Sequence, residues 1–128
     1  MKTIKVVAAI IKKDNKVFAT QRGYGDFAGG WEFPGGKIEE GESPESALVR
    51  EIKEELDSEI QVGKLFYVVE YDYPQFHLSM NCYICELTKG TLTLVEHNAA
   101  KWLSKEELYS VDWLPADRGI VEKLEKNL

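Results

Sequence analysis

The sequence predicts an α+β protein, an α/β/α sandwich in which helices cover both faces of a mixed β-sheet. Segments that favour strands outnumber those that favour helices along the 128 residues. The first strand segment, residues 3–12, is apolar and β-branched at neighbouring positions, which is typical of a strand buried on both faces. Two helical segments, 44–56 and 116–126, stand between and after the strands. This mixture favours a sheet flanked by helices.

Composition and charge indicate a single domain over residues 1–128. Hydrophobic residues make up 44% of the chain and charged residues 30%, which excludes extensive disorder. The longest apolar run, 6–11, is too short to span a membrane, and no signal peptide is recognisable, so we expect a cytoplasmic protein without a membrane partner. A net charge of −6 argues against binding long nucleic acid. It leaves nucleotides open, because a divalent cation can invert the local field.

The chain begins with a predicted β-hairpin. Residues 3–12 and 16–22 are the two strands, and Asp14 and Asn15 form the turn. Residues 23–30 contain four glycines, and we expect a mobile loop there that could act as a lid. A short strand at 31–33, ended by Pro34, and a glycine-rich loop at 35–41 follow.

The best helix start in the chain is Ser43. A serine N-cap followed by Pro44 at the first helical position is a strong start signal. Three apolar residues at four-residue spacing are expected to face the core, namely Leu48, Ile52 and Leu56.

The second half of the chain is predicted to be mostly strand. The predicted elements are long strands at 60–73 and 76–87, short strands at 91–95 and 99–103, a capping box at 104–107 that opens a short helix, and a final helix at 116–126. Cys82 and Cys85 lie within one of these strands at an odd separation, so their thiols should point to opposite faces. We therefore interpret them as structural cysteines rather than as a zinc or redox pair.

The predicted helix carries an unusual group of acids. Glu51, Glu54 and Glu55 have spacings that place three carboxylates on one helical stripe, where like charges destabilise the helix. Further acids precede them, namely Glu39, Glu40 and Glu42. A hard divalent cation would relieve this crowding, and Mg²⁺ or Mn²⁺ suits carboxylate oxygens. The alternative is a solvated acidic helix face, which glutamate-rich stripes usually are.

A longer pattern favours the metal site. Five residues separate Gly36 from Glu42, and seven residues separate Glu42 from the run Arg-Glu-Ile-Lys-Glu-Glu at 50–55. This pattern resembles the Nudix box, and a chance match has a probability on the order of 10⁻⁷ per starting position. The family usually continues with glycine and an aliphatic residue, where this chain has Asp57 and Ser58. Aspartate can adopt a left-handed helix end, and Ile60 could supply the apolar contact.

The resemblance covers nearly the whole chain and is greatest to MutT-type and CTP pyrophosphohydrolase members of the family. It extends to residues 31–37, 70–74 and 114–117, and to Glu96 six residues before Trp102. It implies Mg²⁺-dependent hydrolysis of nucleoside triphosphates to monophosphate and pyrophosphate. It leaves open whether cytidine nucleotides (CTP, dCTP or modified dCTP) or 8-oxo-dGTP is the substrate. A nucleotide-binding sensor without activity is a further alternative, and the chain could be a monomer or a homodimer.

The resemblance also assigns roles to residues. The Gly35 carbonyl and the carboxylates of Glu51, Glu54, Glu55 and Glu96 would be metal ligands, and Glu96 could instead be the general base. Arg50 would orient the glutamates, while Glu42 would tie the loop to the helix. The expected substrate contacts are Arg22 and Lys37 on the phosphates and Phe33 and Asp117 near the base.

Asp117 carries the prediction of base preference. An ionised aspartate only accepts hydrogen bonds, so it would favour the exocyclic amine of cytosine over the carbonyl of uracil. The alternative is that Asp117 complements the dipole of the last helix. His77 and His97 are given no role in the site, although His97 neighbours Glu96 and could touch the site.

Overall fold

The computed structural model describes residues 1–95 and 97–128. Its strands are β1 (Lys2–Lys13), β2 (Lys16–Arg22), β3 (Trp31–Glu32), β4 (Gly35–Lys37), β5 (Glu59–Asp72), β6 (Phe76–Lys89) and β7 (His97–Leu103). Its helices are α1 (Pro44–Leu56), the 3₁₀ helices η1 (Lys105–Ser110) and η2 (Pro115–Asp117), and α2 (Arg118–Asn127). No helix within these described residues is long and apolar enough to cross a membrane.

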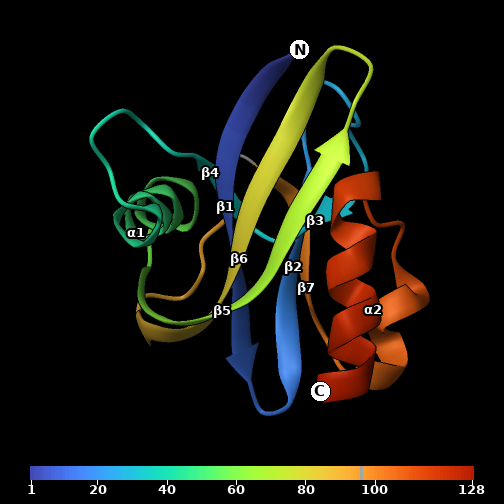
Figure 1. The fold of residues 1–128 in the computed structure, drawn as a ribbon. Helices are drawn as coiled ribbons and strands as arrows, with labels where there is room; N and C mark the ends of the chain where they lie inside the picture. The colour runs from blue at the N-terminus through green and yellow to red at the C-terminus, as the bar shows by residue number, and fades with distance from the viewer. Residues whose placement is uncertain (96) are drawn as a thin grey trace.

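The strands form a mixed sheet with the order β3-β2-β1-β6-β5, in which β4 pairs with β1 and β7 pairs with β2. The central pair, β1 and β6, is parallel, whereas β5 and β6 form a long antiparallel hairpin. Two helices lie on opposite sides of these strands, with α1 on the left and α2 on the right of Figure 1. The predicted α/β/α sandwich with a mixed sheet is therefore confirmed.

Strand β1 separates two hydrophobic cores. Ala8 and Ile10 pack in the core that α2 covers, and Val7, Ala9 and Ile11 pack in the core that α1 covers. Because successive strand residues point to opposite faces, a strand that is apolar at every position supplies both cores.

Helix α1 begins and ends as its sequence predicts. The Ser46 N–H donates to Ser43 Oγ at 3.1 Å, and Leu48, Ile52 and Leu56 are fully buried. Asp57 ends the helix in the left-handed conformation, with φ 47° and ψ 44°. The capping box at Ser104 is present but opens a 3₁₀ helix, and η2 precedes α2 where a single helix was predicted.

Two segments differ from the prediction. Gly35 lies in a strand instead of a loop, paired with Ala8 of β1, and a side chain at Gly35 would collide with the Val7 carbonyl. Residues 91–95 were predicted to be a strand, and this is wrong. Their backbone bonds to the end of α1 instead of to a strand, because the Val95 N–H donates to the Glu55 carbonyl at 3.1 Å.

The two cysteines are buried, free thiols on opposite faces of β6. Cys82 lies in the core under α2, and Cys85 lies in the core under α1. Burial raises the pKa of both thiols, that of Cys85 to about 12. The structure thus supports their interpretation as structural residues.

Candidate active site

One open cleft of about 890 Å³ contains residues from both ends of the predicted site. Glu51 and Glu55 of α1 line one part of it, together with Gly35 and Lys37 of β4. A second group of lining residues comes from other elements, namely Arg22, Phe33, Tyr73, Leu114 and Asp117. Segments that are far apart in the sequence therefore meet around a single space, which is large enough for a nucleotide.

The close approach of β4 to α1 fixes the Glu51 carboxylate. A side chain on Gly36 would occupy the place of this carboxylate, so only glycine is accommodated there. The side chains of Glu51 and Glu55 are 14% and 15% exposed, whereas that of Glu54 is 59% exposed and does not line the cleft. The sequence-predicted stripe therefore has two sheltered carboxylates and one in solvent.

Arg50 connects these carboxylates to the loop before the helix. Its Nε and Nη2 donate to the two oxygens of Glu42 at 2.7 and 2.8 Å, and its Nη1 donates to Glu51 at 2.9 Å and to Glu54 at 3.2 Å. Its Nη2 also donates to the Lys37 carbonyl at 3.0 Å. These bonds match the expected orienting contacts of Arg50 and the expected tie between loop and helix.

The pairing of Arg50 with Glu42 shifts the pKa of both groups. The hydrogen bond from Arg50, together with one from the Glu39 backbone N–H, lowers the pKa of Glu42 to about 2. The same bond to Glu42 raises the pKa of Arg50 above its ordinary value. Both groups of this pair are therefore ionised at neutral pH.

The carboxylates of α1 suit a hard cation by their chemistry, although their oxygens do not converge on one point. Glu51, Glu54 and Glu55 offer only carboxylate oxygens, the ligands that Mg²⁺ and Mn²⁺ prefer. Within residues 1–95 and 97–128, no three acidic, histidine or cysteine side chains already surround a common point. Arg50 lies between Glu51 and Glu54, so a bound ion would require these side chains to turn. Glu96 lies outside the described residues.

Asp117 lies buried at the other part of the cleft. Its side chain makes no capping bond to α2, and its Oδ2 instead accepts from the Phe33 N–H at 3.0 Å. Burial raises the pKa of Asp117 to about 8, although the Phe33 N–H lowers it. The expectation of an ionised Asp117 is therefore corrected. At neutral pH the carboxyl is mostly protonated, because desolvation disfavours the charge.

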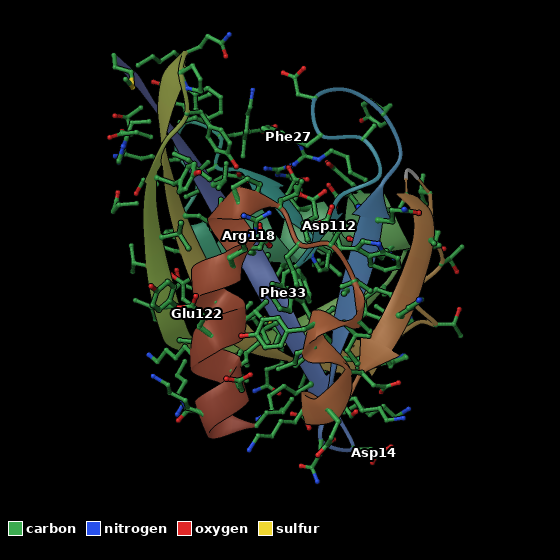
Figure 2. All side chains as sticks on the ribbon, turned by 90° about the vertical axis from the view of Figure 1, so that its right-hand side faces the viewer. Asp14, Phe27, Phe33, Asp112, Arg118 and Glu122 are labelled. Carbon is green, nitrogen blue, oxygen red and sulfur yellow. The ribbon has the colours of Figure 1, made fainter. Side chains whose placement is uncertain are left out.

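Phe33 and Arg22 are more constrained than the sequence suggested. Phe33 is 3% exposed and stacks on Trp113 with ring centroids 4.8 Å apart, and Figure 2 shows it in the interior beside α2. Arg22 lines the cleft, but two bonds to Glu32 at 2.7 and 3.0 Å already neutralise its charge. Lys37, by contrast, is exposed where β4 borders the cleft.

Sequence reasoning missed two features of the cleft. Tyr73 lines it and contacts Phe27 of the 23–30 loop, whose ring centroid is 5.5 Å away. Burial is the main cause that raises the pKa of the Tyr73 hydroxyl. The signal was the cluster of aromatic residues around the Pro74 turn. His97 was given no role, yet its Nε2 lies 4.0 Å from Glu55 Oε2.

Comparison with known proteins gives the family. The model of the NUDIX domain matches residues 1–124. The chain belongs to the Nudix family. It is 39% identical to the CTP pyrophosphohydrolase of Escherichia coli, over 95% of this chain and 91% of that protein. It is 35% identical to the 8-oxo-dGTP diphosphatase of the same organism, over 98% of this chain and 99% of the relative.

A solved structure supports the same assignment. The solution structure of the E. coli ORF135 protein superposes on this Nudix chain with a TM-score of 0.85 at 38% identity, covering 98% of this chain and 91% of that one. The chain is thus a Nudix hydrolase of the (deoxy)nucleoside triphosphate pyrophosphohydrolase type. Nudix hydrolases generally use a divalent metal such as Mg²⁺.

Proposed function

We propose that the protein hydrolyses (deoxy)nucleoside triphosphates to nucleoside monophosphate and pyrophosphate with Mg²⁺, favours cytidine nucleotides and serves control of the nucleotide pool. The observation that carries this proposal is the cleft that Glu51 and Glu55 of α1 line together with the buried Asp117. The phosphates would lie near α1, and the base would lie near Asp117. The name of one relative, CTP pyrophosphohydrolase, supports the choice of base.

The carboxylate part of the cleft would carry out the hydrolysis. Glu51, Glu54, Glu55 and the Gly35 carbonyl would hold Mg²⁺, and Glu96 would be a further ligand or the general base. Bound Mg²⁺ neutralises phosphate charge and makes a water molecule more acidic. Arg50 keeps Glu51 aimed at the cleft while Glu42 holds Arg50 in place. Lys37 would contact the phosphates, and Arg22 is a weaker candidate because Glu32 pairs with it.

Asp117 would read the base. Its Oδ2 is occupied by the Phe33 N–H, so the rest of the carboxyl is available to a base beside Phe33. When ionised, it accepts from the amine of cytosine and repels the carbonyl of uracil. When protonated, it has both a donor and an acceptor, as an asparagine side chain has.

A second substrate is favoured by that protonated state. A carboxyl with a donor and an acceptor can also pair with the edge of an oxidised guanine, so 8-oxo-dGTP is the alternative substrate. The name of a relative, 8-oxo-dGTP diphosphatase, supports this alternative. The idea of a sensor without activity has less support, since Arg50 and the three glutamates of α1 are all present.

A kinetic panel tests the proposal. Pyrophosphate release is measured with Mg²⁺ for CTP, dCTP, 5-methyl-dCTP, UTP, dGTP and 8-oxo-dGTP. We expect the highest kcat/KM among the cytidine nucleotides. A kcat/KM at least tenfold higher for 8-oxo-dGTP selects the alternative, and no release from any of them rejects the function.

A further inference from the structure

Ser58 stands where the Nudix box usually has an aliphatic residue, and it is 1% exposed. Its hydroxyl donates to the Leu56 carbonyl at 2.9 Å and accepts from the Leu92 N–H at 2.8 Å. This buried hydroxyl both donates and accepts a hydrogen bond, so its burial is compensated by polar contacts. It links the end of α1 to a segment far along the chain.

That segment, residues 90–95, is here called the strap. It lies directly over Ser58, since a Cβ on Gly90, whose φ is 99°, would be 2.5 Å from Ser58 Oγ and 2.9 Å from Ser58 Cα. Leu92 has a left-handed φ of 55° and is buried in the core that α1 covers. A leucine in this conformation is strained, so its surroundings must hold it there. The hydrogen bond to Ser58 is one such restraint.

The strap leads from Ser58 to the carboxylates of α1, and Figure 1 shows the chain after β6 running beside the end of that helix. At its far end, the Val95 N–H donates to the Glu55 carbonyl at 3.1 Å. His97, the first residue of β7, lies 4.0 Å from the Glu55 carboxylate through its Nε2. Both Val95 and His97 therefore lie close to Glu55.

We propose that Ser58 is a positioning residue for the metal site, which acts through the strap on Glu55. This inference rests on the proposed function. Without the Ser58 hydroxyl, the Leu92 N–H loses its buried acceptor, and the strained Leu92 loses a restraint. The strap then holds the last turn of α1 less firmly. Ser58 thus takes the position of the aliphatic residue of the box and holds the strap by a hydrogen bond that an aliphatic side chain cannot make.

The main test is binding of Mn²⁺ alone, measured by electron paramagnetic resonance in the absence of nucleotide. We expect Ser58→Ala to weaken Mn²⁺ binding about tenfold, the scale found for residues that support metal ligands. At saturating metal, kcat should fall by a similar factor while KM for the nucleotide stays within about threefold, since the base contacts are remote. Thr88→Val is the matched control. It removes a hydroxyl that donates to the neighbouring Glu59 carbonyl at 3.1 Å and does not touch the strap, so both readings should stay at wild type.

Two further variants separate the hydroxyl from packing. Ser58→Val restores an aliphatic residue to the box, and we expect it to show the loss of Ser58→Ala rather than wild-type binding. Gly90→Ala adds a methyl group that would collide with Ser58, so it displaces the strap while the Ser58 hydroxyl is kept.

The outcomes are distinct. A folded Ser58→Ala protein with wild-type Mn²⁺ affinity and kcat overturns the inference, and so does wild-type behaviour of Ser58→Val. If Ser58→Ala does not fold at the assay temperature, Mn²⁺ binding and kcat are measured on Gly90→Ala instead, and wild-type values of both overturn the inference. If the wild-type protein itself binds no Mn²⁺, the proposed function fails as well, whereas equal binding by wild type and Ser58→Ala removes only the role of Ser58.

Discussion

Arg50 and Glu42 face each other across the junction between loop and helix, with both carboxylate oxygens of Glu42 bonded to the guanidinium at 2.7 and 2.8 Å. The planar fork of arginine allows this double contact and leaves Nη1 for Glu51. Arg50 thus links Glu42 to Glu51, which lines the cleft, although neither Arg50 nor Glu42 lines it. In the proposed function, the hydrolysis depends on this link.

The first prediction concerns this fork. Arg50→Lys keeps the positive charge but cannot bond Glu42 twice and Glu51 at the same time. We expect kcat to fall about 10- to 100-fold, the range for residues that orient metal ligands. The measurement is the initial rate at saturating Mg²⁺ and nucleotide. Lys53→Gln on the same helix, whose cation faces Asp57 at 3.8 Å, should keep the wild-type rate. An Arg50→Lys enzyme of full activity would show that the fork is dispensable.

The second prediction separates chemistry from stability at Glu54. This side chain is 59% exposed, so Glu54→Gln should leave the thermal melting temperature nearly unchanged. Removal of a carboxylate that is proposed to bind the metal should nevertheless lower the rate about 10²-fold or more. Glu45→Gln, in the first turn of α1, is the control that should keep the rate. Loss of folding, or retention of the wild-type rate, counts against Glu54 as a ligand.

The third prediction is a base preference that changes with pH. Asp117, with a pKa of about 8, gains its negative charge as the pH rises from 6.5 to 9. The ratio of kcat/KM for CTP to that for UTP should therefore increase with pH by tenfold or more, because only the ionised carboxyl repels the uracil carbonyl. Asp117→Asn should give a lower ratio at pH 9 and no increase. A wild-type ratio that stays constant over this range places base recognition elsewhere.

The fourth prediction concerns stability at the same residue. In the unfolded chain Asp117 ionises near its ordinary pKa of 3.8, and in the folded protein it ionises near 8. Between these values the folded state holds the additional proton, so the contribution of Asp117 to stability is full below about pH 4 and is lost as the pH rises to about 8. Asp117→Asn retains an acceptor for Phe33 without titrating. Its free energy of unfolding relative to wild type should rise by up to about 1.4 kcal/mol per pH unit across this window. Urea melts at pH 5 and pH 7.5 measure the difference, and a pH-independent difference contradicts the raised pKa.

The fifth prediction concerns the end of α1. Asp57 adopts a left-handed conformation that glycine adopts without strain. Asp57→Gly should therefore raise the free energy of unfolding by about 0.5–1 kcal/mol, after allowance for the greater flexibility of the unfolded chain. A thermal melt should show an increase of about 3–5 °C. A lower melting temperature would mean that the aspartate side chain stabilises this turn by other contacts.

Local signals predicted much of this fold. Ser43, Pro44 and the spacing of Leu48, Ile52 and Leu56 placed α1 at its observed position, because capping and periodicity act within a few residues. The alternation of faces also placed Cys82 and Cys85 in different cores. The pattern from Gly36 to Glu55 predicted the contacts of Arg50, since these residues share one loop and one helix.

Features that depend on distant parts of the chain were beyond such reasoning. Gly35 is a strand residue only because β1 lies beside it, and residues 91–95 are held by the end of α1. The protonation of Asp117 depends on burial beside Phe33, which lies 84 positions away in the sequence. Desolvation depends on how the folded chain packs around the carboxyl, so the residues next to Asp117 in the sequence could not predict it.

The placement of Cys82 and Cys85 in separate cores gives the protein two internal reporters of unfolding. Each thiol is shielded and has a raised pKa, so neither reacts with an alkylating reagent until the layer above it opens. Alkylation of Cys82 records separation of α2 from the strands, and alkylation of Cys85 records separation of α1. The relative rates of alkylation at the two thiols, assigned by fragmentation of the peptide that contains both, would give the order in which the layers of the sandwich come apart.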